Sequence, residues 1–200
     1  VYNIKIPIDN STPVLYEIER RSLEPKAQWK IGVKPVGVKG TNSAVLELSN
    51  LPPIDLEKHI NYLLNYPYGC LEQTSSTGFP LLYIENMIDL DESRKQKLTN
   101  IVTETIKRIY GFQDATGVFN YWQGTTTYYE WADIYAGDFL VEAAKKGHKV
   151  DEKVMNRWIS VQRQKASKWT DTGSLSRINQ AYRLFVLVQA NNPDIGAMNR

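Results

Sequence analysis

Hydrophobic and polar residues alternate along the first fifty residues of the chain. The segments YNIKIPI, VLYEIER, AQWKIGVKP and SAVLELS share this period of two, and Pro, Gly, Asn and Ser lie between them. Such alternation is typical of β-strands that bury one face. The pattern therefore predicts a short β-strand segment over residues 1–50, which we assign to a preceding β domain.

Near Leu51 the period changes from that of a strand to that of a helix, and we place the start of a second domain there, over residues 51–200. Gly111 and Gly147 are suited to end helices, whereas DESRKQK and Asp151 provide capped helix starts. Together these signals predict helices at about 54–65, 71–88, 93–110, 128–146, 151–165 and 176–190.

The segment GFQDATGVFNYWQGTTTYYEWADIYAGDFL has more aromatic residues and glycines than an ordinary surface loop. We expect Phe119, Tyr121, Trp122 and Trp131 to pack against helices rather than to bind a ligand. A second segment with a similar but weaker pattern, KASKWTDTGSLS, precedes another predicted helix. Helix pairs joined by such loops predict a mainly α fold, an α/α toroid of helical hairpins that is incomplete at its C-terminal end.

The composition is that of an ordinary globular protein, with 42% hydrophobic and 23% charged residues and a net charge of +2. The basic residues are scattered, which argues against a nucleic-acid-binding surface. No apolar run is long enough to span a bilayer and no signal peptide is visible. We expect the chain to be an excised piece, because it opens in strand-like sequence and closes in a loop, NNPDIGAMNR.

The only cysteine, Cys70, lies in the stretch YPYGCLEQTSS and so has no internal disulfide partner. A lone cysteine is usually a small buried hydrophobic residue. Two local features point to chemistry instead. Gly69 allows a sharp turn just ahead of the helix, and a thiol at a helix N-terminus is more reactive than one in mid-helix.

Gln73 follows Cys70 at the i, i+3 spacing, so the two side chains share one helix face. Attack of the thiolate on the Gln73 carboxamide would expel ammonia and close a thioester ring of about 15 atoms. The product is a stored electrophile that must be kept dry until an amine or hydroxyl reaches it. Tyr66, Pro67 and Tyr68 are suited to enclose it.

The stretch PYGCLEQT resembles the thioester signature Pro-x-Gly-Cys-x-Glu-Gln of the alpha-2-macroglobulin and complement family, in particular its bacterial branch. The likeness extends over about residues 36–200, through LEKHINYLLNYPYGCLEQTSS, GVFNYWQG, YYEWADIYAGDFLVEAAKKGHKV and INQAYRLFVLVQA. It implies a terpenoid-cyclase-like α/α toroid in which Cys70 and Gln73 are the thioester pair. Glu72 matches the acid between them and is expected to be structural.

Two departures from the family pattern matter. The usual Trp-Leu-Thr-Ala-Tyr reads here as WADIY, residues 131–135. Some complement members use a downstream histidine to favour hydroxyl targets, but neither His59 nor His148 matches that position. We expect both histidines to be solvated or capping residues, and amines to react better than hydroxyls.

The resemblance implies a fragment of a bacterial alpha-2-macroglobulin-like protease trap, located in the periplasm or cell envelope, with a membrane-anchored lipoprotein as one form of the parent. Its partners would be target proteases, captured through a lysine amine, and other domains of the parent chain that protect the thioester. The reaction is single-use, so the protein would be an inhibitor and not an enzyme, with no metal or cofactor. In the excised piece we expect a free Cys70 and an ordinary Gln73 carboxamide.

Two other classes of function stay open at this point. The first is an interaction module of the same fold whose thioester never forms. The second is an α/α-toroid enzyme, which would need acidic clusters or metal ligands, and the nearest candidate, DLDES, is typical of a helix cap. A cysteine protease or transglutaminase would need a histidine in reach of Cys70, which neither histidine provides.

Overall fold

The computed structural model describes residues 13, 15–46, 48, 69–86 and 90–199. The chain divides into two compact units, Val1–Ile54 and Asp55–Arg200, and each is described here by itself. The predicted boundary near Leu51 and the predicted helix at 54–65 lie outside the described residues and stay predictions.

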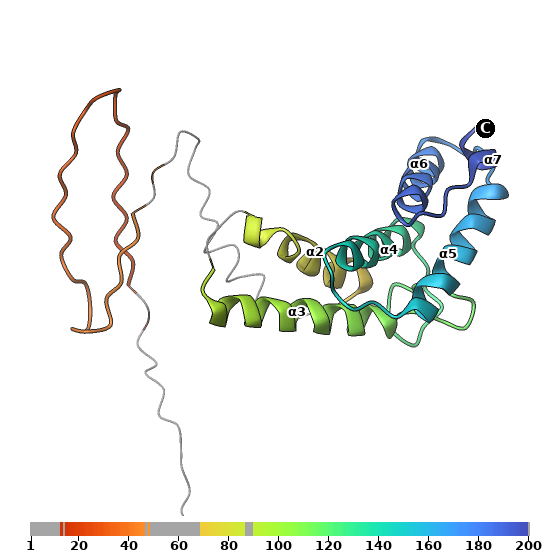
Figure 1. Ribbon diagram of the computed structural model, residues 1–200, viewed down its shortest axis with the longest axis horizontal. Coiled ribbons are helices and arrows are strands. Elements are labelled where there is room, and N and C mark those ends of the chain that lie inside the picture. Colours follow the sequence, from red (N-terminus) through yellow and green to blue (C-terminus); the bar gives the residue numbers. More distant parts are fainter. Residues whose placement is uncertain (1–12, 14, 47, 49–68, 87–89, 200) are drawn as a thin grey trace, which may run out of the picture. The chain divides into compact units, whose positions relative to one another are not determined.

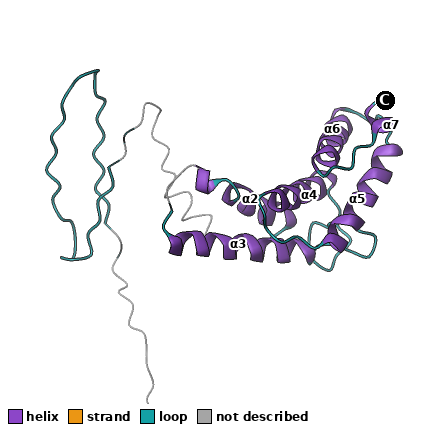
Figure 2. Cartoon of the chain, viewed as in Figure 1, coloured by secondary structure: helices purple, strands orange, loops and turns teal. Residues whose placement is uncertain are grey.

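In the first unit, the described residues form extended chain and turns, with no strand among them (Figure 2). Turns occur where the Ala27 N–H donates to the Glu24 carbonyl at 3.0 Å and the Thr41 N–H to the Val38 carbonyl at 3.2 Å. Apolar side chains of this unit, such as Tyr16, are exposed. The predicted strands are therefore not found in this part. Alternation marks the side chains that could face a core, but a strand also needs a hydrogen-bonded partner.

The regular elements in the described part of the second unit are helices, as predicted (Figure 1). α2 packs against α3 and α4, α4 packs against α6, and α6 packs against α5. The elements are α2 (Leu71–Leu81), a 3₁₀ turn η1 (Ile84–Asn86), α3 (Glu92–Tyr110), α4 (Glu130–Lys145), α5 (Glu152–Ser167), α6 (Ser174–Gln189) and α7 (Ile195–Met198).

The capping signals read from the sequence are confirmed. The Asp91 carboxylate accepts the Arg94 N–H at 2.8 Å at the start of α3, and the Asp151 carboxylate accepts the Lys153 N–H at 2.7 Å at the start of α5. α4 ends at Lys145, and Gly147 follows the C-cap residue Lys146 with a φ of +87°, the left-handed conformation that glycine adopts at little cost.

α2 ends at Leu81, well before the predicted end at residue 88. Pro80 lies in its last turn and has no N–H to continue the helical hydrogen bonds. The chain then tightens, because the Tyr83 N–H donates to the Pro80 carbonyl at 3.1 Å, three residues back. The predicted helix is therefore correct in its start and wrong in its length.

The core of the second unit depends on close approach of α4 and α5. Trp158 of α5 is fully buried and lies over Gly137 of α4, where an added Cβ would overlap the indole ring. Phe119, from the loop before α4, is also fully buried and stacks on Trp158 with ring centroids 6.4 Å apart. The prediction that Phe119 fills the core is confirmed.

The other aromatic residues of this segment lie outside the core. Trp122 is 47% exposed and Trp131 is 39% exposed. Trp131 instead stacks on Tyr135 of the same helix at 4.8 Å. Tyr121 is partly buried against the core.

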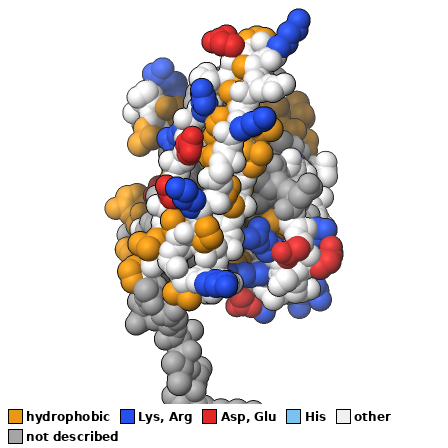
Figure 3. Space-filling model, turned by 90° about the vertical axis from the view of Figure 1, so that its left-hand side faces the viewer, with side chains coloured by type: hydrophobic (Ala, Val, Ile, Leu, Met, Phe, Trp, Pro, Cys, Tyr) orange, Lys and Arg blue, Asp and Glu red, His pale blue; other side chains and the backbone are white. Residues whose placement is uncertain are grey.

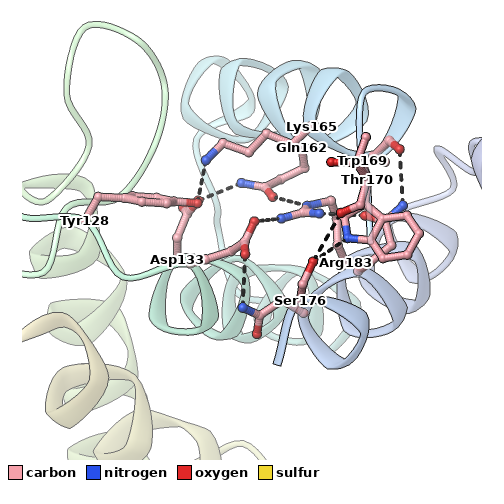
Figure 4. Close-up of polar contacts among 12 residues, drawn as sticks. Tyr128, Asp133, Gln162, Lys165, Trp169, Thr170, Ser176 and Arg183 are labelled. Atoms are coloured by element: carbon pink, nitrogen blue, oxygen red, sulfur yellow. Dashed lines mark hydrogen bonds and ion pairs between the residues drawn. The ribbon is translucent and has the colours of Figure 1, made fainter. Parts of the chain in front are cut away.

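A fully buried carboxylate, Asp133 of α4, joins three parts of this unit (Figure 4). Its Oδ1 accepts the Phe119 N–H at 3.0 Å and the Trp158 Nε1–H at 2.9 Å. Its Oδ2 accepts the Gln162 amide at 2.7 Å and the Tyr128 hydroxyl at 3.0 Å. Burial raises the pKa of Asp133, while these donors stabilise its charged form and oppose the rise.

The buried guanidinium of Arg183 extends this network to α6 (Figure 4). It donates to the side-chain oxygens of Gln162 at 3.1 Å and Gln180 at 2.6 Å, and it pairs with the Glu130 carboxylate. Because Glu130 begins α4 and Gln162 lies in α5, one side chain fixes three helices relative to each other.

We expect Gly137→Ala to destabilise the second unit, because the new methyl group would overlap the Trp158 ring. Overpacking of this kind costs about 1–3 kcal/mol. The matched control is Gly196→Ala, where the nearest atom to an added Cβ is an Asp194 oxygen at 3.5 Å. Urea unfolding followed by tryptophan fluorescence should give a lower midpoint for Gly137→Ala only. Equal midpoints would contradict this packing.

We also expect Asp133→Asn to destabilise the same unit. The new amide group cannot accept the hydrogen bonds that Oδ2 takes from Gln162 and Tyr128, and each buried donor left unpaired costs about 1–3 kcal/mol. Asp171→Asn is the control, since Asp171 pairs with Arg177 at an exposed site and its loss should leave the midpoint nearly unchanged. A wild-type midpoint for Asp133→Asn would refute the assigned role.

Candidate functional site

The reactive stretch identified in the sequence lies at the first turn of α2. Cys70 is the N-cap residue, in extended conformation with φ −79° and ψ 173°, and it is 4% exposed. The Leu71 N–H, which has no partner within the helix, donates to the Tyr121 carbonyl at 3.0 Å. The Thr74 N–H closes the first turn onto the Cys70 carbonyl at 3.0 Å.

The Gln73 side chain folds back over this turn. Its Oε1 accepts the Cys70 N–H at 3.3 Å, and the two residues form a capping box. Gln73 is exposed, whereas Cys70 is buried. The structure thus brings the predicted thiol and carboxamide together within one turn, with only the carboxamide open to solvent.

Gly69 makes room for this arrangement. A Cβ added there would overlap the Gln73 Oε1 and would lie 4.0 Å from the Trp122 ring. Glycine leaves this space to the Gln73 carboxamide, which a larger residue would push aside. The structure gives Gly69 a steric role, where the sequence suggested a turn.

The remaining predicted site residues lie elsewhere or outside the description. Tyr66, Pro67, Tyr68 and His59 are outside the described residues, so their roles stay predictions. His148 follows Gly147, and its N–H donates to the Ala143 carbonyl at 3.0 Å, which places it at the end of α4.

Tyr121 is a site residue that the sequence did not single out as one. Its hydroxyl donates to the Glu72 carboxylate at 3.4 Å. A side-chain hydrogen bond with Cys70 is the largest cause that raises the pKa of the Tyr121 phenol, and burial and the charge of Glu72 add to it. No local pattern could reveal this contact, because Tyr121 lies in a distant loop.

Two further rings flank Tyr121 and border the site. Trp122 meets the Tyr121 ring edge-on at 5.6 Å, and Tyr129, the N-cap residue of α4, meets it at 4.7 Å. Tyr129 is 57% exposed, so this border faces solvent. The loop that precedes α4 thus supplies aromatic rings beside the first turn of α2.

Charge on one face of the molecule, and the potential for metal binding or membrane crossing in the described residues, can also be assessed. On the face shown in Figure 3, Lys and Arg side chains are interspersed with acidic and apolar ones and form no continuous basic patch. Within the described part of the chain, no group of three or more His, Cys, Asp and Glu residues could hold a metal ion. No helix among the described residues is both long and apolar enough to cross a membrane.

Comparison with known proteins gives a consistent picture. A family model for the A-macroglobulin TED domain matches residues 43–182. The alpha-2-macroglobulin of Escherichia coli (strain K12) is 30% identical over a 161-residue alignment that covers 65% of this chain and 10% of that protein.

Solved structures agree with the sequence match. A Salmonella alpha-2-macroglobulin reacted with methylamine aligns with a TM-score of 0.62 at 29% identity, over 74% of this chain and 10% of that one. An Escherichia coli alpha-2-macroglobulin activated by porcine elastase aligns with a TM-score of 0.55 at 29% identity, over 67% of this chain and 13% of that one. The predicted mainly α fold of the α/α toroid type is confirmed. The chain spans about a tenth of the length of the curated relative.

We expect Gly69→Ala to hinder any ring closure between Cys70 and Gln73, because the new methyl group would displace the carboxamide. A displacement of about 1 Å can cost roughly 100-fold in rate. Thiol titration of the freshly purified full-length protein should show more free Cys70 in this variant than in wild type. Gly196→Ala, remote from the site, serves as control, and equal thiol content in all three proteins would argue against the steric role.

Proposed function

Because the chain belongs to the family of A-macroglobulin TED domains, we propose that Cys70 and Gln73 form an internal thioester that captures attacking proteases covalently. The observation that carries the proposal is the first turn of α2, where the Gln73 carboxamide lies against the Cys70 backbone at 3.3 Å. Since the chain spans about a tenth of its curated relative, the activity of the whole protein is part of the proposal.

The thioester would form by attack of the Cys70 sulfur on the carboxamide carbon of Gln73. The carbon–sulfur bond forms, the carbon–nitrogen bond breaks, and the nitrogen leaves as ammonia after taking up the thiol proton. Proximity within one turn makes this otherwise slow exchange feasible. The room beside Gly69 favours it, because the carboxamide can lie over the turn without a clash.

Capture would reverse the roles of the groups. A lysine amine of the protease attacks the Gln73 carbonyl carbon, an amide bond forms, and the Cys70 sulfur leaves as a thiol. The exposure of Gln73 supports this step, because the attacked carbon belongs to the accessible partner of the pair. Each thioester reacts once, so the protein is an inhibitor and not a turnover catalyst.

Two of the similar structures bear on the partners. One relative is described as reacted with methylamine, a small amine, and another as activated by elastase, a protease. By analogy, we infer that the partners of this chain are proteases that present a lysine amine, together with other domains of a longer protein that protect the bond. We place that protein in the periplasm or cell envelope, with a membrane-anchored lipoprotein as its form.

Intact-mass measurement of the full-length protein that carries this sequence tests the proposal. The native protein should be lighter by one ammonia and should lack a free thiol at Cys70. Methylamine should add to Gln73 and release that thiol in equal amounts, and it should react better than glycerol.

Cys70→Ala is the matched control for that measurement and should neither lose ammonia nor take up methylamine. Equal incorporation by wild type and Cys70→Ala would refute the thioester. A wild-type protein with full mass and an unreactive Gln73 would instead identify the domain as an interaction module without covalent chemistry.

A further inference from the structure

Trp122 places an aromatic ring beside the carboxamide of Gln73. A Cβ added to Gly69 would lie 3.5 Å from the Gln73 Cδ, the carbon that the proposed thioester would activate, and 4.0 Å from Cζ3 of the Trp122 indole. The carbon and the ring therefore cannot be further apart than these two distances together. Because residue 69 is glycine, its own side chain does not stand between them.

Both groups are open to solvent. Trp122 is 47% exposed and Gln73 is exposed, whereas Cys70 is 4% exposed. Single exposed apolar side chains are common on protein surfaces, so the exposure of Trp122 carries no meaning by itself. Its place beside the attacked carbon gives it one, because a nucleophile that reaches this carbon from solvent also comes close to the ring.

The backbone that carries the ring is held in place without a ligand. The Thr125 N–H and hydroxyl both donate to the Trp122 carbonyl, at 3.4 Å and 3.0 Å. The carbonyl of the preceding residue, Tyr121, accepts the Leu71 N–H of α2 at 3.0 Å, and the Tyr121 ring meets the indole edge-on at 5.6 Å. A surface that is already ordered binds a ligand at a lower entropic cost.

A lysine side chain matches such a surface. Its amine is carried on four methylene groups, and lysine lays this stem along apolar surface while its nitrogen stays free. An indole offers a large apolar face and also attracts a cationic nitrogen as it approaches. A serine or threonine hydroxyl is carried on a single carbon and has no stem to lay on the ring.

We propose that Trp122 receives the alkyl stem of the attacking lysine and makes the site selective for amines on long apolar chains. This inference rests on the proposed thioester and defines the class of nucleophile that it accepts. The bonds are those of capture: nitrogen bonds to the Gln73 carbonyl carbon, the carbon–sulfur bond breaks, and one proton passes from nitrogen to sulfur. Trp122 makes no bond and acts as a specificity-determining residue.

The test is a competition between two amines on the full-length protein that carries this sequence. Methylamine and n-butylamine are mixed at equal concentration in excess, and mass spectrometry of the peptide that contains Gln73 gives the ratio of the two adducts. Both are primary amines with the same charge, so the ratio reports the stem. It is measured within one sample and does not depend on how fast the thioester opens.

We expect Trp122→Ala to lower the ratio of butylamine to methylamine adduct. Burial of one methylene group is worth about fourfold in rate, and a stem on one face of a ring buries the equivalent of about one or two, so the fall should be roughly 4- to 16-fold. Trp122→Phe keeps a smaller ring and should retain most of the wild-type ratio.

Trp169→Ala is the matched control and should leave the ratio unchanged. Its indole is half-buried in the loop between α5 and α6, where it donates to the Ser176 hydroxyl at 2.8 Å. Access past other domains of the parent chain is common to wild type and variants, so the difference between their ratios isolates the ring.

The outcomes separate this inference from the proposed function. If wild type contains no thioester by intact mass, the proposed function fails and the selectivity fails with it. If wild type contains the thioester and Trp122→Ala keeps the wild-type ratio, only the selectivity is overturned. Faster uptake of both amines at an unchanged ratio also overturns it, because the ring would then be a shield. Should Trp122→Ala form no thioester, Trp122→Gln, which fills the space with a polar side chain, must show the same fall.

Discussion

The buried carboxylate of Asp133 is the contact on which the geometry of the reactive turn depends. A charge that is fully buried must be hydrogen-bonded, and Asp133 accepts donors from the preceding loop and from two side chains of α5. One donor is the backbone N–H of Phe119. Two residues further on, the carbonyl of Tyr121 receives the N–H of Leu71, the first residue of α2. The position of Cys70 thus follows from a contact made on a different helix.

The same hydrogen bonds that begin α2 also bring its reactive groups together. A helix N-terminus leaves N–H groups without intrahelical partners, and here the Tyr121 carbonyl satisfies the N–H of Leu71. The Gln73 carboxamide satisfies the N–H of Cys70 in the manner of a capping box. The capping hydrogen bond that stabilises the helix start therefore also holds the carboxamide near the thiol. Bringing the two groups together has little additional conformational cost.

How much the sequence predicted depends on how local each feature is. The helix start at Asp151 and the helix end at Gly147 were predictable because a cap involves residues within one turn. The end of α2 was also local and was missed, because the apolar periodicity continues past Pro80. The contact between Tyr121 and Glu72 spans 49 residues and depends on how the loop folds over α2, which no periodicity encodes. Among the described residues of the first unit no strand is found, and for a related reason, since pairing requires a partner that alternation does not specify.

The difference in exposure between Cys70 and Gln73 favours one direction of reaction. A nucleophile from solvent would meet Gln73, which is exposed, before it met Cys70, which is buried. If the bond opens, the departing sulfur stays in the interior beside Tyr121, where water has little access to it. Once protecting domains have moved away, an accessible acyl group and a buried leaving group would favour the proposed acylation, because the bond to the incoming amine would form at the surface while the reverse attack would have to come from within the protein. The start of the helix provides this asymmetry, since Cys70 at the N-cap is buried and Gln73 at position N3 is exposed.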